Sequence, residues 1–408
     1  MARKAKEEAA SEEPKDESKK SSKRDFINKI LKADAVKKSK FEIFADSTLT
    51  QITSYIPSGS YSLNRLISGS YFKGFPHGRI TGLGGKKGVG KSYICGNAIR
   101  EAQKLDYLCV VFESESSLDR NFLLRLGVNI DELIFKSVTT INEWKSSVIN
   151  MLETIHAADP DQKVLIILDS AGNLATEKEM EDARENNPAM DRGLRSKQFK
   201  MASRVLTNAV AYNNAAMILT NHIYEKQAQN PNVPPEEVFG GGEGLQYVCS
   251  TIIMLRKLIK KEEKKNVATG LNEKVPSTFI IKANTIKNRL VPEGSKAEIL
   301  VSFKNGLHKW FGLLEDALTH GYMVKDGTIY VKHLDKKFAL EKLYHPNNEN
   351  CWSEIIHEMD EKVQKANAFN SVLSVEEVLE EADLEVSEVS EGDTKPDDDD
   401  NEEVVLED

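Results

Sequence analysis

The chain has 408 residues, of which 40% are hydrophobic and 29% charged, and its formal net charge is −9. This length suits one large domain or two ordinary ones. The longest apolar runs have the length of a strand, far short of the roughly 20 residues of a membrane span, and the charged N-terminus lacks a secretory signal. We therefore expect a cytoplasmic protein with no membrane partner, whose four widely separated cysteines are reduced thiols.

Residues 1–50 are expected to form a charged N-terminal arm. Residues 1–40 contain 13 Lys or Arg against 8 Asp or Glu, and low hydrophobicity predicts that the beginning of this arm is mobile. Helix-like spacing follows from residue 26, and then the aromatic-rich stretch SKFEIFA at 39–45. Such a stretch either adds to a neighbouring molecule as an edge strand or packs onto the core of its own chain.

From residue 51 to 311, predicted strands and helices alternate. Short apolar runs predict the strands and apolar residues at helical spacing predict the helices. The strands are expected within 78–85, 107–115, 163–172, 215–225, 249–258, 277–288 and 296–310, and the helices within 91–104, 141–158 and 195–214. This alternation indicates an α/β fold with a central, largely parallel sheet flanked by helices, in which the last three strands are partly antiparallel. Such folds bind ligands at the carboxyl ends of their strands.

The segment GKKGVGKS matches the phosphate-binding pattern G-x-x-x-x-G-K-[ST] at every fixed position. Its members are Gly85, Lys86, Lys87, Gly88, Val89, Gly90, Lys91 and Ser92. Backbone N–H groups of such a loop converge on phosphate oxygens, Lys91 reaches the terminal phosphates, and Ser92 offers its hydroxyl to Mg²⁺. A predicted strand precedes the loop and a predicted helix follows it, so the segment predicts a nucleotide site.

Carboxylates end two further predicted strands. Asp169 closes a continuous apolar run, where it can hold Mg²⁺ through water while Ser170 approaches the terminal phosphate. Glu113 and Glu115 end the strand that lies between the loop and Asp169 in the sequence. A glutamate there is placed to orient or deprotonate the attacking water. Glu115 is the candidate base, and a solvated loop carboxylate is the alternative.

Asn221 and His222 end another apolar strand. A polar side chain at this place could sense whether the γ-phosphate is present. A lone histidine is more often structural than functional, so its position alone does not decide between the two interpretations.

The C-terminal part of the chain is expected to hold a small α-rich region at 312–372 and a disordered acidic tail at 373–408. Residues 376–408 carry 17 carboxylates and one lysine, a block of like charge. Subtracting its −16, and the +5 of the first 40 residues, from the total leaves about +2 for the body of the chain. A polyanionic partner is therefore not excluded. The tail either keeps the protein soluble or mimics nucleic acid, competing with it or binding a basic partner.

The order of these elements resembles the core of the RecA-type recombinases, and in particular their bacteriophage UvsX-type members. The similarity runs from about residue 26 to about residue 365. It rests on GKKGVGKS, FESES, LRLGVNIDELI, LIILDSAGNLATEKEMEDA, LTNHIYE, FGGGEGLQYVCSTIIMLRK and IKNRL. DSAGNLATEKEMEDA followed by NHIYE and GGGEG is far more specific than a phosphate-binding loop alone.

For the nucleotide site, the resemblance implies ATP with Mg²⁺. Lys91 and Ser92 would bind phosphate and metal. Asp169 would position the metal, and Glu115 would activate the attacking water.

The resemblance implies further nucleotide contacts. Phe122 matches an aromatic residue that stacks on adenine, with Asp119 near the base. His222 matches the γ-phosphate sensor, which is Gln in the bacterial recombinases. Lys287 and Arg289 match basic residues that reach across a subunit interface to the ATP of the neighbouring subunit.

The resemblance also implies two segments that face DNA. The first lies around 177–197, and the helix that continues it carries the basic residues Arg195, Lys197, Lys200 and Arg204. These would neutralise phosphates without reading sequence, although their spacing does not place all four on one face and a solvated helix is the alternative. In the second segment, about 224–244, Gly241 and Gly242 match positions whose N–H groups meet DNA phosphate, and Phe239 could wedge against bases.

We therefore hypothesise an ATPase that forms helical filaments on single-stranded DNA and catalyses homologous pairing and strand exchange with duplex DNA, in recombination, repair and recombination-dependent replication. Its partners would be both DNA forms, further copies of itself, and a single-strand-binding protein and a recombination mediator or loader. The stretch at 39–45 resembles the family's polymerisation strand. A hexameric helicase and a non-catalytic recombination mediator are the alternatives. The presence of Lys91, Glu115 and Asp169 argues against the mediator, because such relatives often lose the loop lysine or the glutamate.

Overall fold

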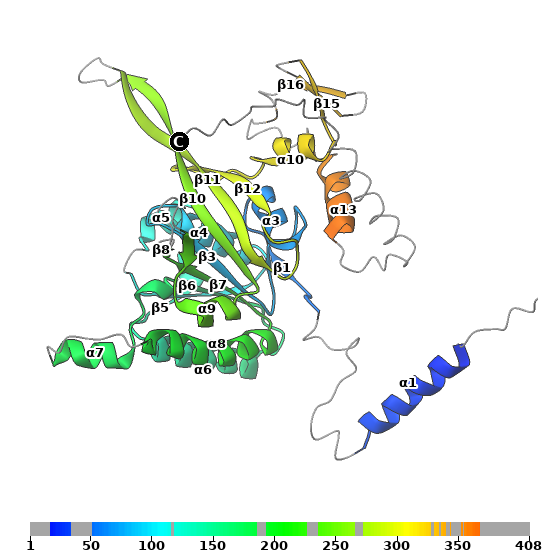
Figure 1. Cartoon of the computed structure of the whole chain (residues 1–408), viewed down its shortest axis with the longest axis vertical. Coiled ribbons are helices and arrows are strands. Elements are labelled where there is room, and N and C mark those ends of the chain that lie inside the picture. The colour runs from blue at the N-terminus through cyan, green and yellow to red at the C-terminus, as the bar shows by residue number, and fades with distance from the viewer. Residues whose placement is uncertain are drawn as a thin grey trace, which may run out of the picture.

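A nine-stranded sheet forms the centre of the molecule (Figure 1). The computed structural model describes residues 17–33, 51–115, 118–185, 193–226, 236–265, 272–327, 330–333, 336–339, 343, 352–353 and 355–367. Within these ranges the strand order of the sheet is β13-β12-β11-β10-β3-β7-β6-β4-β5. The acidic tail and the stretch SKFEIFA lie outside the described residues.

Five neighbouring strands make up the parallel part of the sheet. They are β3 (Ile80–Gly85), β7 (Ala215–Asn221), β6 (Val164–Asp169), β4 (Leu108–Glu113) and β5 (Leu133–Ser137). Every residue of β3, β6 and β7 is buried, which is why these strands read as continuous runs without polar alternation. The predictions of these strands and of β4 are confirmed. The edge strand β5 was not predicted, because its LIFKS sequence has no alternation and is partly exposed.

Helices cover both faces of the sheet. On one face, α3 (Tyr61–Ser68) and α4 (Lys91–Gln103) pack against a core that includes Leu63 and Ala98. On the other, α6 (Ile141–Ala158) and α8 (Leu194–Tyr212) pack against a second core that includes Trp144 and Phe199. The predicted α/β architecture is therefore confirmed. Cys95, Cys109 and Cys249 are free and buried in these layers, as expected of reduced thiols.

Four further strands, antiparallel to one another in sequence order, extend the sheet on the side of β3. They are β10 (Thr251–Lys265), β11 (Asn272–Asn288), β12 (Lys296–Ser302) and β13 (Gly306–Leu307). Residues 251–255 of β10 run parallel to β3, and β10 then continues with β11 as a long antiparallel hairpin that projects beyond the sheet (Figure 1). The antiparallel pairing confirms the prediction. The length of the hairpin was not predicted, because the sequence becomes strongly charged after residue 258.

The remaining helices and strands of the described residues lie outside this sheet and its four covering helices. They are α1 (Glu17–Leu31), β1 (Tyr55–Ile56), β2 (Phe75–Pro76), α5 (Arg120–Arg125), α7 (Glu177–Arg184), β8 (Ile223–Lys226), β9 (Glu236–Phe239), α9 (Gly242–Val248), α10 (Leu313–Thr319), β14 (Val324–Asp326), β15 (Tyr330–His333), β16 (Lys336–Ala339) and α13 (Ile355–Asn367), with short 3₁₀ helices η2 (Ile130–Glu132) and η3 (Ala171–Asn173). No helix among the described residues is long and apolar enough to cross a bilayer.

The C-terminal region has its own hydrophobic cluster, which includes Trp310 and Trp352. Besides the expected helices it contains the three-stranded antiparallel sheet β14-β15-β16. The buried carboxylate of Asp360 in α13 accepts hydrogen bonds from Ser70 Oγ at 2.7 Å and from the Tyr71 backbone N–H at 2.6 Å. These bonds fasten α13 to the segment that follows α3.

Phe239 lies in the core and not on the surface. Its side chain is 1% exposed and belongs to the hydrophobic cluster under α6 and α8. A Cβ atom on Gly82 or Gly84 of β3 would lie 3.0 or 2.8 Å from its ring, so the ring fills the space that these two glycines leave open. The interpretation that Phe239 wedges against bases does not agree with this burial, because the ring cannot reach a base without leaving the core.

We expect Phe239→Ala to lower the free energy of unfolding by about 3–5 kcal/mol, because it removes a buried aromatic ring and leaves a cavity. Urea denaturation measures this loss. The matched control is Tyr212→Ala, whose side chain is 63% exposed and whose replacement should change stability by no more than about 0.5 kcal/mol. Equal stability of the two variants would contradict the placement of Phe239 in the core.

Candidate nucleotide and DNA site

The phosphate-binding loop lies at the carboxyl end of β3 and leads directly into α4. Gly90, the residue before α4, has φ 112°, and a Cβ atom there would lie 2.6 Å from Ile281, so both backbone and space require glycine. Lys91 Nζ donates to the carbonyls of Gly85 at 2.9 Å and Lys86 at 3.3 Å. Burial lowers the pKa of Lys91, and the negative charges of Asp169 and Glu115 oppose that effect.

Asp169 at the end of β6 connects the ends of three elements. Its Oδ2 accepts from Ser92 Oγ at 3.0 Å and its Oδ1 accepts from Thr220 Oγ1 at 2.5 Å. The carboxylate is 3% exposed. Burial raises its pKa, although the bonds from Thr220 and Ser92 act in the opposite direction. Ser92 and Asp169, which the sequence assigns separately to the metal, are hydrogen-bonded to each other, and this hydroxyl–carboxylate pair has the oxygen donors that Mg²⁺ prefers.

Thr220 was missed by the sequence analysis. It is fully buried one residue before the end of β7, and only its interruption of an apolar run could have drawn attention to it. Its hydroxyl donates to Asp169 Oδ1, and Ser92 donates to Oδ2, so each oxygen of the carboxylate has a hydroxyl donor.

Glu115 lies at the centre of a second polar cluster, which it forms with Ser170 and His222. Its Oε1 accepts hydrogen bonds from Ser170 Oγ and, at 2.9 Å, from His222 Nε2. Burial alone would raise the pKa of Glu115, but the bonds from Ser170 and His222 outweigh it and lower the pKa below its ordinary value. Glu113, in contrast, is only 2% exposed. The arrangement therefore favours Glu115 as the base, because its carboxylate is ionised and accessible.

His222 is also joined to the second predicted DNA-facing segment. Strands β8 and β9 pair at the base of that segment, Ile223 opposite Phe239, and residues 227–235 lie outside the described structure. The Gly240 N–H donates to the His222 carbonyl at 3.1 Å. This bond joins the His222 backbone to the segment that leads to α9.

The predicted adenine contacts lie beside α4. Asp119 caps α5 by accepting from the Phe122 backbone N–H at 3.0 Å. The Phe122 ring meets Tyr93 edge to face, with 4.9 Å between centroids, and Tyr93 directly follows Ser92. The contact of either residue with a base stays a prediction.

Lys287 and Arg289 lie at the opposite end of the sheet from the phosphate-binding loop. Lys287 pairs with Ile252, which pairs with Gly82, whereas Leu255 pairs with Gly85. At about 3.3 Å per residue, three residues separate the two levels by about 10 Å along the strands. Lys287 Nζ donates to the carbonyls of Gln246 at 2.7 Å and Tyr247 at 3.3 Å. Burial and the charge of Arg289 lower the pKa of Lys287.

Tyr247 was also missed by the sequence analysis. Its side chain is 66% exposed in α9, and Lys287 Nζ lies 5.9 Å from the centre of its ring. This exposed aromatic ring therefore lies on the same surface as Lys287 and Arg289.

The structure brings the two predicted DNA-facing segments together where α8 meets α9. Lys197, Lys200 and Arg204 are exposed on α8. A Cβ atom on Gly242 would lie 2.5 Å from Ser196 Oγ, and one on Gly244 would lie 2.8 Å from the Lys200 backbone. A hollow of about 380 Å³ lies between the helices, lined by Lys200, Ser203, Arg204, Thr207, Gly244, Tyr247 and Val248.

Gly241 and Gly242 stand at the start of α9 with φ 84° and 70°, backbone angles that glycine tolerates best. Their contacts with DNA stay predictions, as do those of the basic residues on α8. Arg195 differs from its three basic neighbours. Its guanidinium turns inward to the carbonyls of Ala171 and Gly172, and it does not join their exposed row.

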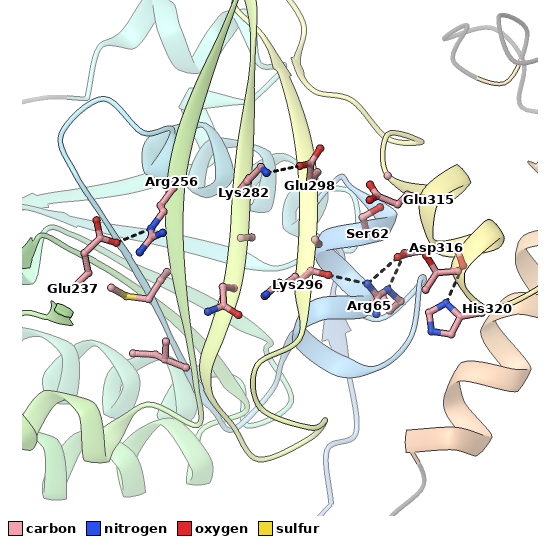
Figure 2. A pocket seen from close by; sticks show the side chains of 17 residues that line it. Ser62, Arg65, Glu237, Arg256, Lys282, Lys296, Glu298, Glu315, Asp316 and His320 are labelled. Atoms are coloured by element: carbon pink, nitrogen blue, oxygen red, sulfur yellow. Dashed lines mark hydrogen bonds and ion pairs between the residues drawn. The ribbon is translucent and has the colours of Figure 1, made fainter. Parts of the chain in front are cut away.

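A hollow of about 870 Å³ lies over β10, β11, β12 and α10 (Figure 2). Its charged side chains pair across it. Arg256 Nε lies 2.8 Å from Glu237 Oε2, Lys282 Nζ 3.3 Å from Glu298 Oε1, and Arg65 Nε 2.8 Å from Asp316 Oδ2 (Figure 2). None of the predicted nucleotide-site residues lines it. We therefore do not assign the nucleotide to this hollow.

Comparisons with known proteins agree with this fold. A sequence profile of the RecA N-terminal domain matches residues 27–308. The recombination and repair protein of Enterobacteria phage T4 is 29% identical over 252 residues, which cover 60% of this chain and 60% of that protein. Protein RecA of Aquifex aeolicus is 29% identical over 314 residues, which cover 76% of this chain and 83% of that protein. Protein RecA of Thermus aquaticus is 27% identical over 276 residues, 67% and 74% of the two chains. The alignment with the T4 protein thus spans less than two thirds of that protein's length.

The raised pKa of Asp169 predicts that Asp169→Asn stabilises the folded chain at neutral pH. A carboxyl whose pKa is higher in the folded than in the unfolded chain contributes stability below its ordinary pKa of 3.8, and that contribution is lost as pH rises through the raised value. An amide does not ionise and avoids this loss. Urea unfolding without nucleotide and Mg²⁺, from pH 8 down toward pH 4, should therefore show a stability advantage of the variant that narrows as pH falls through the raised pKa toward the ordinary value of 3.8.

The control for this measurement is Asp161→Asn, at an exposed position, which should follow the wild type at each pH. An Asp169→Asn variant that is less stable than the wild type at pH 8 would show that burial does not dominate at this carboxylate.

Proposed function

Since the chain belongs to the RecA family, we propose that it is a DNA-dependent ATPase that forms helical filaments on single-stranded DNA and catalyses homologous pairing and strand exchange in recombination and repair. The observation that carries this proposal is the polar cluster at the carboxyl ends of β3, β4, β6 and β7. There Lys91, the Ser92–Asp169 pair and the Glu115–His222 pair converge. The exposed basic row of α8 lies on the helix that covers the same sheet.

The residues of the cluster have separate roles in hydrolysis. Lys91 and the N–H groups of the loop would bind the terminal phosphates of ATP, and the Ser92 and Asp169 oxygens would hold the metal. Bound Mg²⁺ would neutralise negative charge on the phosphates. Glu115, ionised because Ser170 and His222 outweigh its burial, accepts a proton from the attacking water.

His222 connects hydrolysis to DNA. Its Nε2 donates to Glu115 in the structure, and a γ-phosphate is a competing acceptor for the same N–H. His222 would therefore move toward the phosphate, release the Glu115 oxygen for water, and displace the backbone of Gly240 through their hydrogen bond. In this way the presence or absence of the γ-phosphate would change the position of the second DNA-facing segment.

Filament formation would complete the site. Lys287 and Arg289 lie about 10 Å from the level of their own loop along the strands, so we propose that they contact the ATP of a neighbouring subunit. The exposed edge strand β5 is a suitable acceptor for the stretch at 39–45 of another subunit. A hollow of about 390 Å³ beside β5 is lined by Val111, Leu118, Arg120, Leu123, Ile130, Asp131, Leu133 and Phe135.

In this proposal DNA binds along the basic row of α8 and the start of α9. Lys197, Lys200 and Arg204 supply charge to phosphates without sequence preference. Homologous duplex DNA is the second substrate. A single-strand-binding protein and a mediator or loader are the proposed protein partners.

We expect single-stranded DNA to stimulate steady-state ATP hydrolysis strongly at low salt, and duplex DNA to stimulate it less. Glu115→Gln should lower kcat by about 10²–10⁴ because it removes the general base, while nucleotide and DNA binding persist. Lys91→Ala should abolish hydrolysis. The control is Glu153→Gln, at an exposed position of α6. Hydrolysis indifferent to DNA in the wild type would contradict the proposed function.

The shared site predicts complementation between two inactive variants. Lys287→Ala should fold and bind nucleotide as a monomer but hydrolyse ATP poorly on DNA. In a mixture with Glu115→Gln, some interfaces combine an intact Glu115 with an intact Lys287 of the neighbour, so hydrolysis should recover above that of either variant alone.

A mixture of Glu115→Gln with Lys91→Ala is the control, because both changes lie on the same side of the interface and no intact combination with both groups exists. Absence of recovery in the first mixture, or normal hydrolysis by Lys287→Ala alone, would show that Lys287 does not act across an interface.

A further inference from the structure

Arg195 occupies the first turn of α8 but faces the protein interior. Its Nη2 donates to the Ala171 carbonyl at 3.2 Å and also to the Gly172 carbonyl. The guanidinium carbon lies 5.8 Å from the centre of the buried Phe199 ring, and Nε is itself buried. Guanidinium donors thus hold two carbonyls of η3, the turn directly after Ser170.

The turn that Arg195 holds contacts the catalytic cluster. A Cβ atom on Gly172 would lie 3.0 Å from both Asn221 Oδ1 and His222 Cδ2, so Gly172 packs directly against those two residues. Ser170, at the start of the same turn, donates to Glu115, the acceptor of the His222 bond. Direct contacts therefore lead from Arg195 to both members of the Glu115–His222 pair.

The other end of this connection is the proposed DNA face. Arg195 shares a single helix with Lys197, Lys200 and Arg204, whose side chains are exposed, and Lys197 is only two residues away. A helix moves largely as one body, so DNA phosphates that pull on these side chains also displace the Arg195 guanidinium.

We propose that Arg195 is a positioning residue that couples single-stranded DNA on α8 to the alignment of Glu115 and His222. The inference rests on the proposed DNA-dependent hydrolysis and assigns one residue to its DNA dependence. Arg195 acts through the η3 carbonyls and does not neutralise a DNA phosphate. Turning it outward would remove the guanidinium donors from the Ala171 and Gly172 carbonyls and leave the buried Ala171 carbonyl with only the long bond from the Leu174 N–H at 3.4 Å, which opposes such a movement.

The test compares Arg195→Met with Arg195→Lys and Lys197→Ala. The first readout is the ratio of kcat at saturating single-stranded DNA to kcat without DNA. Allosteric coupling commonly amounts to about 5- to 150-fold, and we expect Arg195→Met to lower the ratio about 5-fold or more. Arg195→Lys keeps a charged donor group and should therefore retain part of the wild-type ratio.

The second readout is the salt dependence of single-stranded DNA affinity, measured by fluorescence anisotropy with a non-hydrolysable ATP analogue. For single strands, log K of DNA binding falls with log[salt], and loss of one phosphate contact makes this negative slope shallower by about 0.7. Lys197→Ala should show this decrease, and Arg195→Met should keep the wild-type slope.

Two results would overturn the inference. If Arg195→Met reduces the salt dependence of DNA affinity but DNA at saturation still stimulates its kcat as in the wild type, Arg195 is a phosphate contact. If Arg195→Met changes neither the salt dependence nor the stimulation of kcat, Arg195 has a structural role only. A wild type that DNA does not stimulate would refute the proposed function instead. If Arg195→Met does not fold, Gly172→Ala tests the same connection. Its methyl group meets Asn221 and His222, so it too should lower the ratio, and normal stimulation in it would overturn the inference.

Discussion

The candidate site depends above all on two hydrogen bonds to one buried carboxylate. Asp169 accepts from Ser92 at the start of α4 and from Thr220 near the end of β7, so the ends of three separate elements are held at one point. The sheet order explains why this is possible, since β3, β7 and β6 are direct neighbours and run parallel. Parallel strands bring their carboxyl ends to the same edge. A buried, ionised carboxylate is costly unless such donors satisfy it, and the raised pKa of Asp169 shows that the cost is only partly offset.

The cost of burying a charged carboxylate has a different outcome at Asp169 and at Glu115. Burial outweighs the hydrogen bonds at Asp169 and raises its pKa, whereas the bonds from Ser170 and His222 outweigh burial at Glu115 and lower its pKa. In the proposed function the first group would receive a cation, and the second would act, ionised, as the base. Environments that shift neighbouring carboxylates in opposite directions are typical of sites with divided roles.

The sequence predicted the parts of this arrangement that local patterns encode. The phosphate-binding loop, the strand ending at Asp169 and the helix at 141–158 follow from a fixed motif, a continuous apolar run and helical spacing. Thr220, Tyr247 and the inward orientation of Arg195 could not be predicted, because each depends on which distant segment packs against it. Phe239 illustrates the same limit. Its place near a Gly-rich loop suggested a surface role, but the glycines of β3 that make room for its ring lie more than 150 positions earlier in the chain. The charged hairpin arms of β10 and β11 pair with each other, so they form strands without an apolar pattern.

The direction of the strands also limits how the molecule can assemble. Strand β10 runs parallel to β3 and β11 returns antiparallel, so the strand that carries Lys287 passes the level of the loop at Ala283, the partner of Leu255, and then runs toward the opposite edge of the sheet. One chain therefore cannot present both the loop and Lys287 at the same edge. If Lys287 acts on nucleotide, the amino-terminal edge of one sheet must face the carboxyl edge of the next. Such a contact joins two different surfaces, and a head-to-tail contact closes into a ring only at particular rotations and otherwise continues as a helical filament. If Lys287 acts in this way, the strand order makes repeated assembly a condition of a complete site.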